Sequence, residues 1–162
     1  RLRPIFERMT RAGATNIDIV AADEGGKLDE MGGFDCVLID APCSGSGSWR
    51  RKPDAKWRLA EIQLKQRIKD QREVLEKGAA LVKEGGRLVY ITCSVLPEEN
   101  AAQVEAFLKA HKNFEIIPYA KQWAAAIGLP APESADGSHD TLLLTPARHG
   151  TDGFFIALMR RN

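Results

Sequence analysis

The sequence has no long hydrophobic run and few cysteines and histidines. No stretch approaches the ~20 consecutive apolar residues that a transmembrane helix requires, so we expect no membrane span. The cysteines are odd in number and lack Cys-x-x-Cys spacing, which argues against a disulfide framework and a zinc site; they are Cys36, Cys43 and Cys93. The three histidines are scattered along the chain. We therefore expect a cytoplasmic protein, in a reducing compartment, without a bound metal.

A large excess of one charge is also missing. The 23 Lys and Arg residues stand against 22 Asp and Glu, a net charge of +1, so no overall field attracts nucleic acid. Positive charge is nevertheless clustered in a basic stretch that consists of Arg50, Arg51, Lys52, Lys56 and Arg58. Such a cluster can bind phosphate groups locally, and a solvated loop is the alternative. Trp57 lies within this stretch, and its helical spacing favours a position in the core.

What is present is the composition of a globular domain. Hydrophobic residues make up 44% of the 162 residues and charged residues 28%, which allows one domain with a real core. The opening RLRPIFER has no initiator Met and no signal-peptide-like apolar region, and it lies inside an expected helix. We therefore expect a single domain over residues 1–162 that is truncated at its amino terminus.

Strand-like and helix-like segments alternate along the chain. Short apolar runs rich in β-branched residues predict strands, and apolar residues at helical spacing predict helices. The expected strands cover residues 17–22, 34–39, 87–92, 114–118 and 154–159; the expected helices cover 1–12 and 54–83 and begin again at 97; loops are expected at 25–33, 41–53 and 128–141. This order indicates an α/β layered domain with a mostly parallel sheet.

Two of the expected strands are followed by cysteines in polar loops. Asp40 and Cys43 come directly after the strand over 34–39, and Cys93 follows the strand over 87–92. Ligands bind beyond the carboxyl ends of strands in open α/β sheets, so we expect these three side chains to share one active site. A thiolate there can be a nucleophile for acyl transfer, redox exchange or addition to a pyrimidine ring. Cys36, inside a strand, fits a buried structural cysteine instead.

Five segments resemble, in order, the motifs of one enzyme family. Residues 40–47, which contain Asp40-Ala41-Pro42-Cys43, resemble the Pro-Cys motif of the Sun (Fmu) family of RNA cytosine-5 methyltransferases. Residues 90–100, which contain Thr92-Cys93-Ser94, resemble its Thr-Cys motif. Residues 16–23 are similar to the strand and acid beside the adenine of S-adenosylmethionine, 50–58 to the family's basic stretch, and 149–157 to its carboxy-terminal signature.

The resemblance implies a Rossmann-like class I methyltransferase fold. It also implies transfer of a methyl group from S-adenosylmethionine to carbon 5 of cytosine in RNA, with ribosomal RNA as the expected substrate. It assigns Cys93 as the nucleophile that adds to carbon 6 and Cys43 as the thiol that assists its release, while Asp40 is placed to serve N3 of the base. Asp23, Asp40 and Pro42 are expected beside the cofactor, and the basic stretch on the RNA.

One part of the family pattern is not found in the sequence. The Gly pairs at 25–26 and 32–33 follow the wrong strand for the Gly-rich cofactor loop, so the first two strands of the sheet are expected to lie upstream of Arg1. We therefore expect the chain alone to be inactive, to bind cofactor poorly and to self-associate through exposed sheet edges. A methyltransferase-fold protein that binds RNA without catalysis is the alternative. A cysteine-based redox or acyl-transfer enzyme is a third reading, against which the missing Cys-x-x-Cys motif counts.

Overall fold

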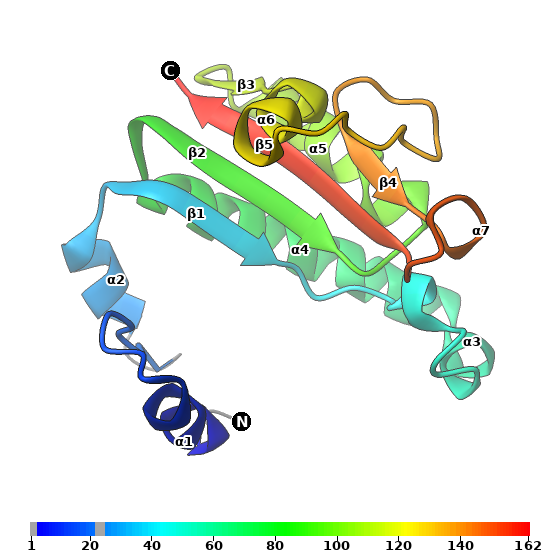
Figure 1. The fold of residues 1–162 in the computed structure, drawn as a ribbon, viewed down its shortest axis with the longest axis horizontal. Coiled ribbons are helices and arrows are strands. Elements are labelled where there is room, and N and C mark those ends of the chain that lie inside the picture. Colours follow the sequence, from blue (N-terminus) through cyan, green and yellow to red (C-terminus); the bar gives the residue numbers. More distant parts are fainter. Residues whose placement is uncertain (1–2, 22–24) are drawn as a thin grey trace. The chain divides into compact units, whose positions relative to one another are not determined.

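The computed structural model describes residues 3–21 and 25–162, and the chain divides into two compact units, Arg1–Met31 and Gly32–Asn162 (Figure 1). The amino-terminal unit contains helices α1 (Arg3–Ala12) and α2 (Gly25–Met31). Helix α1 confirms the predicted first helix. It ends at Gly13, whose φ of 64° is the left-handed conformation that glycine adopts most readily at a helix end.

Two expectations for the amino-terminal unit are wrong. Residues 17–21 belong to no strand, because the described elements of their own unit are the helices α1 and α2, which have no free strand edge for the backbone hydrogen bonds that a strand requires; residue 22 lies outside the described residues. Ile17 is accordingly 47% exposed. The expected loop over 25–33 is largely helix α2, since good helix formers such as Lys27 and Leu28 follow the two glycines.

The second unit, which we call the main unit, is built around a five-stranded sheet. Its strands are β1 (Phe34–Asp40), β2 (Val82–Thr92), β3 (Phe114–Ile116), β4 (Leu142–Leu144) and β5 (Phe154–Arg161), in the order β1-β2-β5-β3 with β4 also paired to β5. Figure 1 shows β5 beside β2, running in the opposite direction. Strand β1 is one edge of the described sheet, and Leu38 on it is 62% exposed. Self-association through such an edge stays a prediction.

The sheet is mixed, so the expectation of a mostly parallel sheet is wrong for the described strands. Strands β1 and β2 are parallel, whereas β5 runs antiparallel to β2, β3 and β4. The reason lies in the connections. Two parallel strands need a long crossover connection, which residues 41–81 provide between β1 and β2. Strand β5 follows β4 after a short connection and lies between β2 and β3, antiparallel to both.

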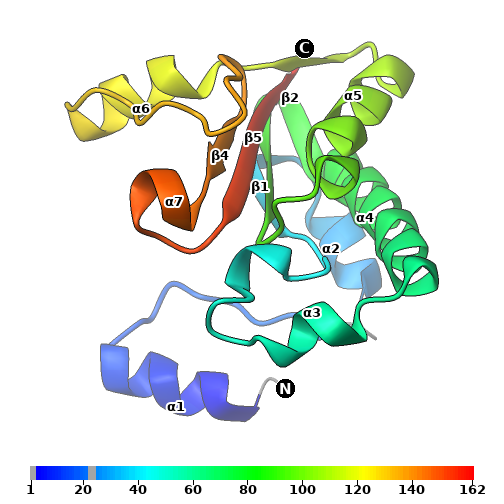
Figure 2. The same cartoon turned by 90° about the vertical axis from the view of Figure 1, so that its right-hand side faces the viewer.

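Helices flank both faces of the sheet in the main unit (Figure 2). The helices of this unit are α3 (Asp54–Arg58), α4 (Glu61–Leu81), α5 (Ala101–Ala110), α6 (Tyr119–Ile127) and α7 (Pro146–His149), with short 3-10 turns η2 (Ser46–Ser48) and η3 (Pro97–Glu99). Helices α4 and α5 lie on one face of the sheet and α6 on the other, whereas α3 lies beyond the end of the sheet. The single helix predicted over 54–83 is therefore two helices. The chain is extended at Leu59 and Ala60, and the Gln63 side chain accepts a hydrogen bond from Ala60 N at 3.2 Å, which starts α4 anew. Helices α6 and α7 and strand β4 were not predicted.

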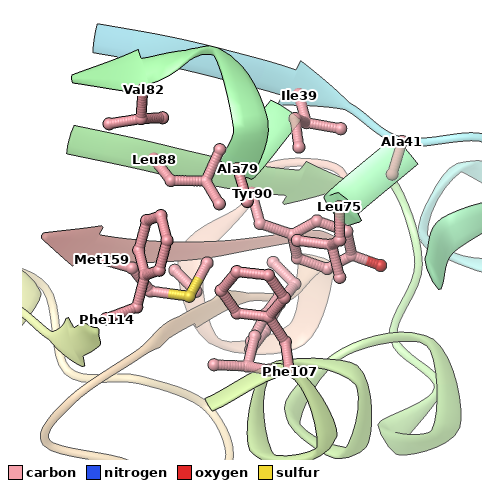
Figure 3. Packing of buried hydrophobic residues seen from close by; sticks show 13 residues of the cluster. Ile39, Ala41, Leu75, Ala79, Val82, Leu88, Tyr90, Phe107, Phe114 and Met159 are labelled. Atoms are coloured by element: carbon pink, nitrogen blue, oxygen red, sulfur yellow. The ribbon is translucent and has the colours of Figure 1, made fainter. Parts of the chain in front are cut away.

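The core lies between the sheet and helices α4 and α5 (Figure 3). Leu88, Tyr90 and Met159 from the sheet are fully buried there. Gly78 brings α4 close to β1, because a Cβ at this position would lie only 2.6 Å from Ile39 Cδ1. The close packing holds the carboxyl ends of β1 and β2 against one helix, and these are the ends that carry the cysteine loops.

Candidate active site

The parallel pairing of β1 and β2 brings the two cysteine loops together. Asp40 and Ile91 are register partners, and Ala41 N donates to Ile91 O at 2.9 Å just beyond them. The chain then places Cys43 Sγ 3.4 Å from Cys93 Sγ, with both thiols half-buried. The expectation that both thiols meet at the carboxyl edge of the sheet is therefore confirmed. Cys36 is exposed, so its expected burial is wrong.

A third segment fixes the two cysteine loops from the carboxy-terminal side. Gly47 N donates to Cys93 O at 3.0 Å, and Gly153 N donates to Gly47 O at 2.9 Å. The backbones meet so closely that a Cβ on Gly47 would lie 2.2 Å from Gly153 O. Only glycine permits this contact. Residues 149–157, noted in the sequence as a signature, therefore support the loops that carry the thiols.

A buried carboxylate joins the two cysteine loops. Glu99 is fully buried, and its side chain accepts hydrogen bonds from Ser44 and Ser94, the residues that directly follow the two cysteines. From the sequence, Glu99 suits the positive end of the helix after Pro97. The structure directs it inward instead. The only feature of the sequence that could have indicated this inward position is that a serine follows each cysteine. The two serines come close to each other only because β1 and β2 pair in the sheet.

The hydrogen bond between the thiols makes them chemically unequal. The hydrogen bond with Cys43 lowers the pKa of Cys93 from 9.0 to about 7, against the opposing effects of burial and of the negative charges on Asp40 and Glu99. The same hydrogen bond, with burial, raises the pKa of Cys43. The two thiols therefore titrate as a pair, in which Cys93 is the readier thiolate when Cys43 is the donor of the shared hydrogen bond.

A cavity of about 660 Å³ opens beside Cys43 and is mainly basic. Its lining comprises Cys43, Ser44, Arg51, Lys52, Pro53, Asp54, Ala55, Arg58, Leu59, Gln63 and Arg67. Three residues of the basic stretch therefore line it, whereas Arg50 and Lys56 lie elsewhere on the surface. Gln63 and Arg67 come from α4 and were missed in the sequence, because helical charge at that spacing is typical of any solvated face.

Several cavity cations are held by acids. Arg51 forms a salt bridge with Asp152, and Arg58 contacts Asp54 at 3.2 Å. Trp57 on α3 is 82% exposed, so its expected place in the core is wrong. The reason is that α3 is five residues long and buries none of them. An aromatic ring is thus available to solvent next to the basic cavity.

The residues expected beside a cofactor are only partly described. Asp40 is exposed at the end of β1. Pro42 O accepts a hydrogen bond from Gln71 Nε2 at 3.0 Å, which ties this loop to α4. Asp23 lies outside the described residues.

Among the residues that are described, no cluster of His, Cys, Asp or Glu has the arrangement of a metal site, and no helix is long and apolar enough to cross a membrane.

Comparison with known proteins gives one consistent match along the chain. The family model of the 16S rRNA methyltransferase RsmB/F matches residues 1–160. The probable ribosomal RNA small subunit methyltransferase B of Synechocystis sp. is 34% identical over 163 residues, and that of Bacillus subtilis is 38% identical over 172 residues. Each alignment covers 99% of this chain and 35% of the relative, so the chain spans about a third of their length.

Solved structures similar to this chain are also named as methyltransferases or as members of the NSun group. NSun6 from Pyrococcus horikoshii with SFG is 26% identical with a TM-score of 0.80, over 99% of this chain and 38% of that one. A methyltransferase homolog protein from the same organism is 30% identical with a TM-score of 0.75, over 99% of this chain and 50% of that one. These likenesses confirm the expected Rossmann-like methyltransferase fold.

Proposed function

The chain belongs to the family of 16S rRNA methyltransferases RsmB/F, and from this premise we propose that its protein transfers a methyl group from S-adenosylmethionine to carbon 5 of a cytosine in ribosomal RNA. The observation that carries the proposal is the pair of thiols 3.4 Å apart at the carboxyl edge of the sheet. One of them is poised as a thiolate near neutral pH. This arrangement suits an addition followed by an assisted release.

Cys93 is the proposed nucleophile. Its thiolate adds to carbon 6 of cytosine, a carbon–sulfur bond forms, and the displaced electron pair makes carbon 5 a nucleophile. N3 of cytosine is a hydrogen-bond acceptor, so a proton supplied there favours this addition. Asp40 at the end of β1 is the group proposed to supply it, as a carboxylic acid once the bound base excludes water from it. After methylation, a water molecule takes the proton of carbon 5, the electrons of that C–H bond restore the double bond between carbons 5 and 6, and the carbon–sulfur bond breaks to release the Cys93 thiolate. Cys43, in contact with Cys93, assists this release.

The cofactor proposed for this reaction is S-adenosylmethionine, which supplies an electrophilic methyl group when bound. The described residues fit a ligand at this place, because Asp40 presents an exposed carboxylate beyond β1, where ligands of open α/β sheets bind. Pro42 would border it with its ring, since its carbonyl oxygen is already held by Gln71. Asp23 is the third residue proposed to border the cofactor.

RNA is the proposed partner of the basic cavity beside Cys43. Four cations line it with a single acid, Asp54; they are Arg51, Lys52, Arg58 and Arg67. The three arginines also form salt bridges, with Asp152, Asp54 and Asp70 respectively, and RNA phosphates would replace these partners. These cations can hold phosphates on either side of a cytosine that has left its stack to reach the thiols. Single-stranded RNA offers such a base at the lowest cost, and the exposed Trp57 ring can stack on a neighbouring base.

The direct test is the product. We expect the whole protein, incubated with unmodified small-subunit ribosomal RNA and S-adenosylmethionine, to produce 5-methylcytidine, which nucleoside mass spectrometry identifies and bisulfite sequencing locates. Naturally methylated RNA is the matched control and should accept little further methyl. Methylation of another base, or of carbon 5 in uracil, would contradict the proposal.

The basic cavity predicts how binding depends on salt. Replacing Arg51, Lys52 and Arg58 with Ala should weaken RNA binding and reduce the slope of log affinity against log salt by at most about 2, since each lost phosphate contact contributes about 0.7 for a single strand. Filter binding over a salt series measures this slope. The matched control replaces three exposed lysines outside the cavity, Lys77, Lys109 and Lys112, with Ala. An equal loss of slope in both variants would mean that the cavity does not bind the RNA.

A further inference from the structure

We propose that Glu99 is the positioning residue of the two thiols: its buried carboxylate holds both cysteine loops so that the sulfur atoms of Cys43 and Cys93 stay within hydrogen-bond distance of each other. The inference rests on the proposed function and identifies the group that prepares its nucleophile. Glu99 touches neither sulfur in this arrangement and acts through the serines that follow them.

One carboxylate spans both loops. Glu99 Oε1 accepts from Ser44 N at 2.8 Å and from Gln71 Nε2 at 3.1 Å. Glu99 Oε2 accepts from Ser44 Oγ and from Ser94 Oγ, each at 2.5 Å. Ser44 follows Cys43 and Ser94 follows Cys93, so both thiols are one residue from an anchor on the same group. Gln71 adds helix α4, from which it also donates to Pro42 O.

The burial of this charge shows how strongly the position is determined. Glu99 is 0% exposed, and no salt bridge joins it to a cation among the described residues. A buried carboxylate is costly unless hydrogen bonds replace its water, and four donors here match its four lone-pair sites. An apolar side chain of similar volume would fill the space at lower cost. An apolar side chain could not accept hydrogen bonds from Ser44 and Ser94, so it would not fix the distance between the two cysteine loops.

That spacing decides whether the thiols interact. The sulfur atoms are 3.4 Å apart, and a displacement of about 1 Å in either loop would remove most of the hydrogen bond. The bond is the main cause that lowers the pKa of Cys93, whereas the negative charge of Glu99 raises that pKa. Glu99 therefore has two opposing influences on the nucleophile, and substitutions can separate its position from its charge.

Two substitutions make this separation. Glu99→Asp keeps the charge but is one methylene shorter, so it cannot reach Ser44 and Ser94 together. Glu99→Gln keeps the length and loses the charge; its oxygen can accept from Ser44 N, and its amide can donate to the serine hydroxyls, which both donate and accept. The matched control is Glu98→Asp, because Glu98 is the exposed neighbour of Glu99.

The measurement is the pH dependence of Cys93 alkylation by iodoacetamide, followed on the Cys93 peptide by mass spectrometry. The wild-type midpoint should lie at about 7, with alkylation falling as pH drops below it because the thiolate is protonated. In Glu99→Asp the midpoint should rise toward 9.0. The rate at pH 7 should then fall about 5- to 10-fold, since a scarcer thiolate is partly offset by its higher nucleophilicity. Glu99→Gln should keep the midpoint at or below the wild-type value, and Glu98→Asp should leave it unchanged.

Each contrary outcome is distinct. A midpoint that moves in Glu99→Gln but not in Glu99→Asp would show that only the charge matters. A lower melting temperature with an unmoved midpoint in Glu99→Asp would reduce Glu99 to a stabilising residue. If Glu99→Asp does not fold, Ser44→Ala removes a single bond to the carboxylate and should raise the midpoint by a smaller amount. An unmoved midpoint there overturns the proposal. Alkylation needs neither RNA nor cofactor, so a protein that methylates no cytosine would refute the function without deciding this test.

Discussion

Replacing Cys93 with Ala should reduce methyl transfer to RNA by about a thousandfold or more and leave no covalent protein–RNA complex. Without the thiolate, carbon 5 of cytosine keeps its low nucleophilicity, and the loss of a covalent nucleophile costs at least this much in other enzymes. Initial rates of methyl incorporation in the whole protein measure the first effect, and denaturing gels the second.

The chain provides a matched control for this substitution. Cys36→Ala makes the same chemical change on β1, at an exposed cysteine away from the thiol pair. It should leave the rate within about twofold of wild type, as is usual for surface changes. A Cys93→Ala protein with normal turnover would remove the proposed nucleophile.

Replacing Cys43 with Ala should have the opposite effect on the adduct: RNA should accumulate on the protein while turnover falls by about a hundredfold or more, the scale of a lost proton-transfer group. Addition through Cys93 is still available, but the release step loses the thiol that contacts it. A band that survives denaturation and disappears on ribonuclease treatment is the readout.

The electrostatics of the pair add a pH signature to this result. Loss of the Cys43 hydrogen bond raises the pKa of Cys93 above about 7 toward 9.0, so the adduct should form more slowly near neutral pH and faster as the pH rises. The double variant Cys43→Ala/Cys93→Ala is the control and should trap nothing. Stable adducts with Cys93→Ala, and none with Cys43→Ala, would exchange the two roles.

Much of the site was determined by the sequence itself. Apolar β-branched runs predicted the strands that became β1, β2 and β5, because such a run is a signal carried by neighbouring residues alone. Polar loops after two of these strands placed Asp40, Cys43 and Cys93 at one edge of the sheet, since the direction of a strand fixes which loop leaves its carboxyl end. The resemblance of ordered motifs then named the family that the relatives confirm.

Only the tertiary structure decided the rest, because it depends on partners that are distant in the sequence. The antiparallel insertion of β5 follows from its pairing between β2 and β3, and the segment over 17–21 forms no strand because the described part of its own unit is helical. Glu99 reaches Ser44 across 55 positions of sequence, and the sulfur atoms meet across 50. Local pattern places a side chain on a helix or a loop, but the distances that set a pKa arise only when the sheet brings separate loops together.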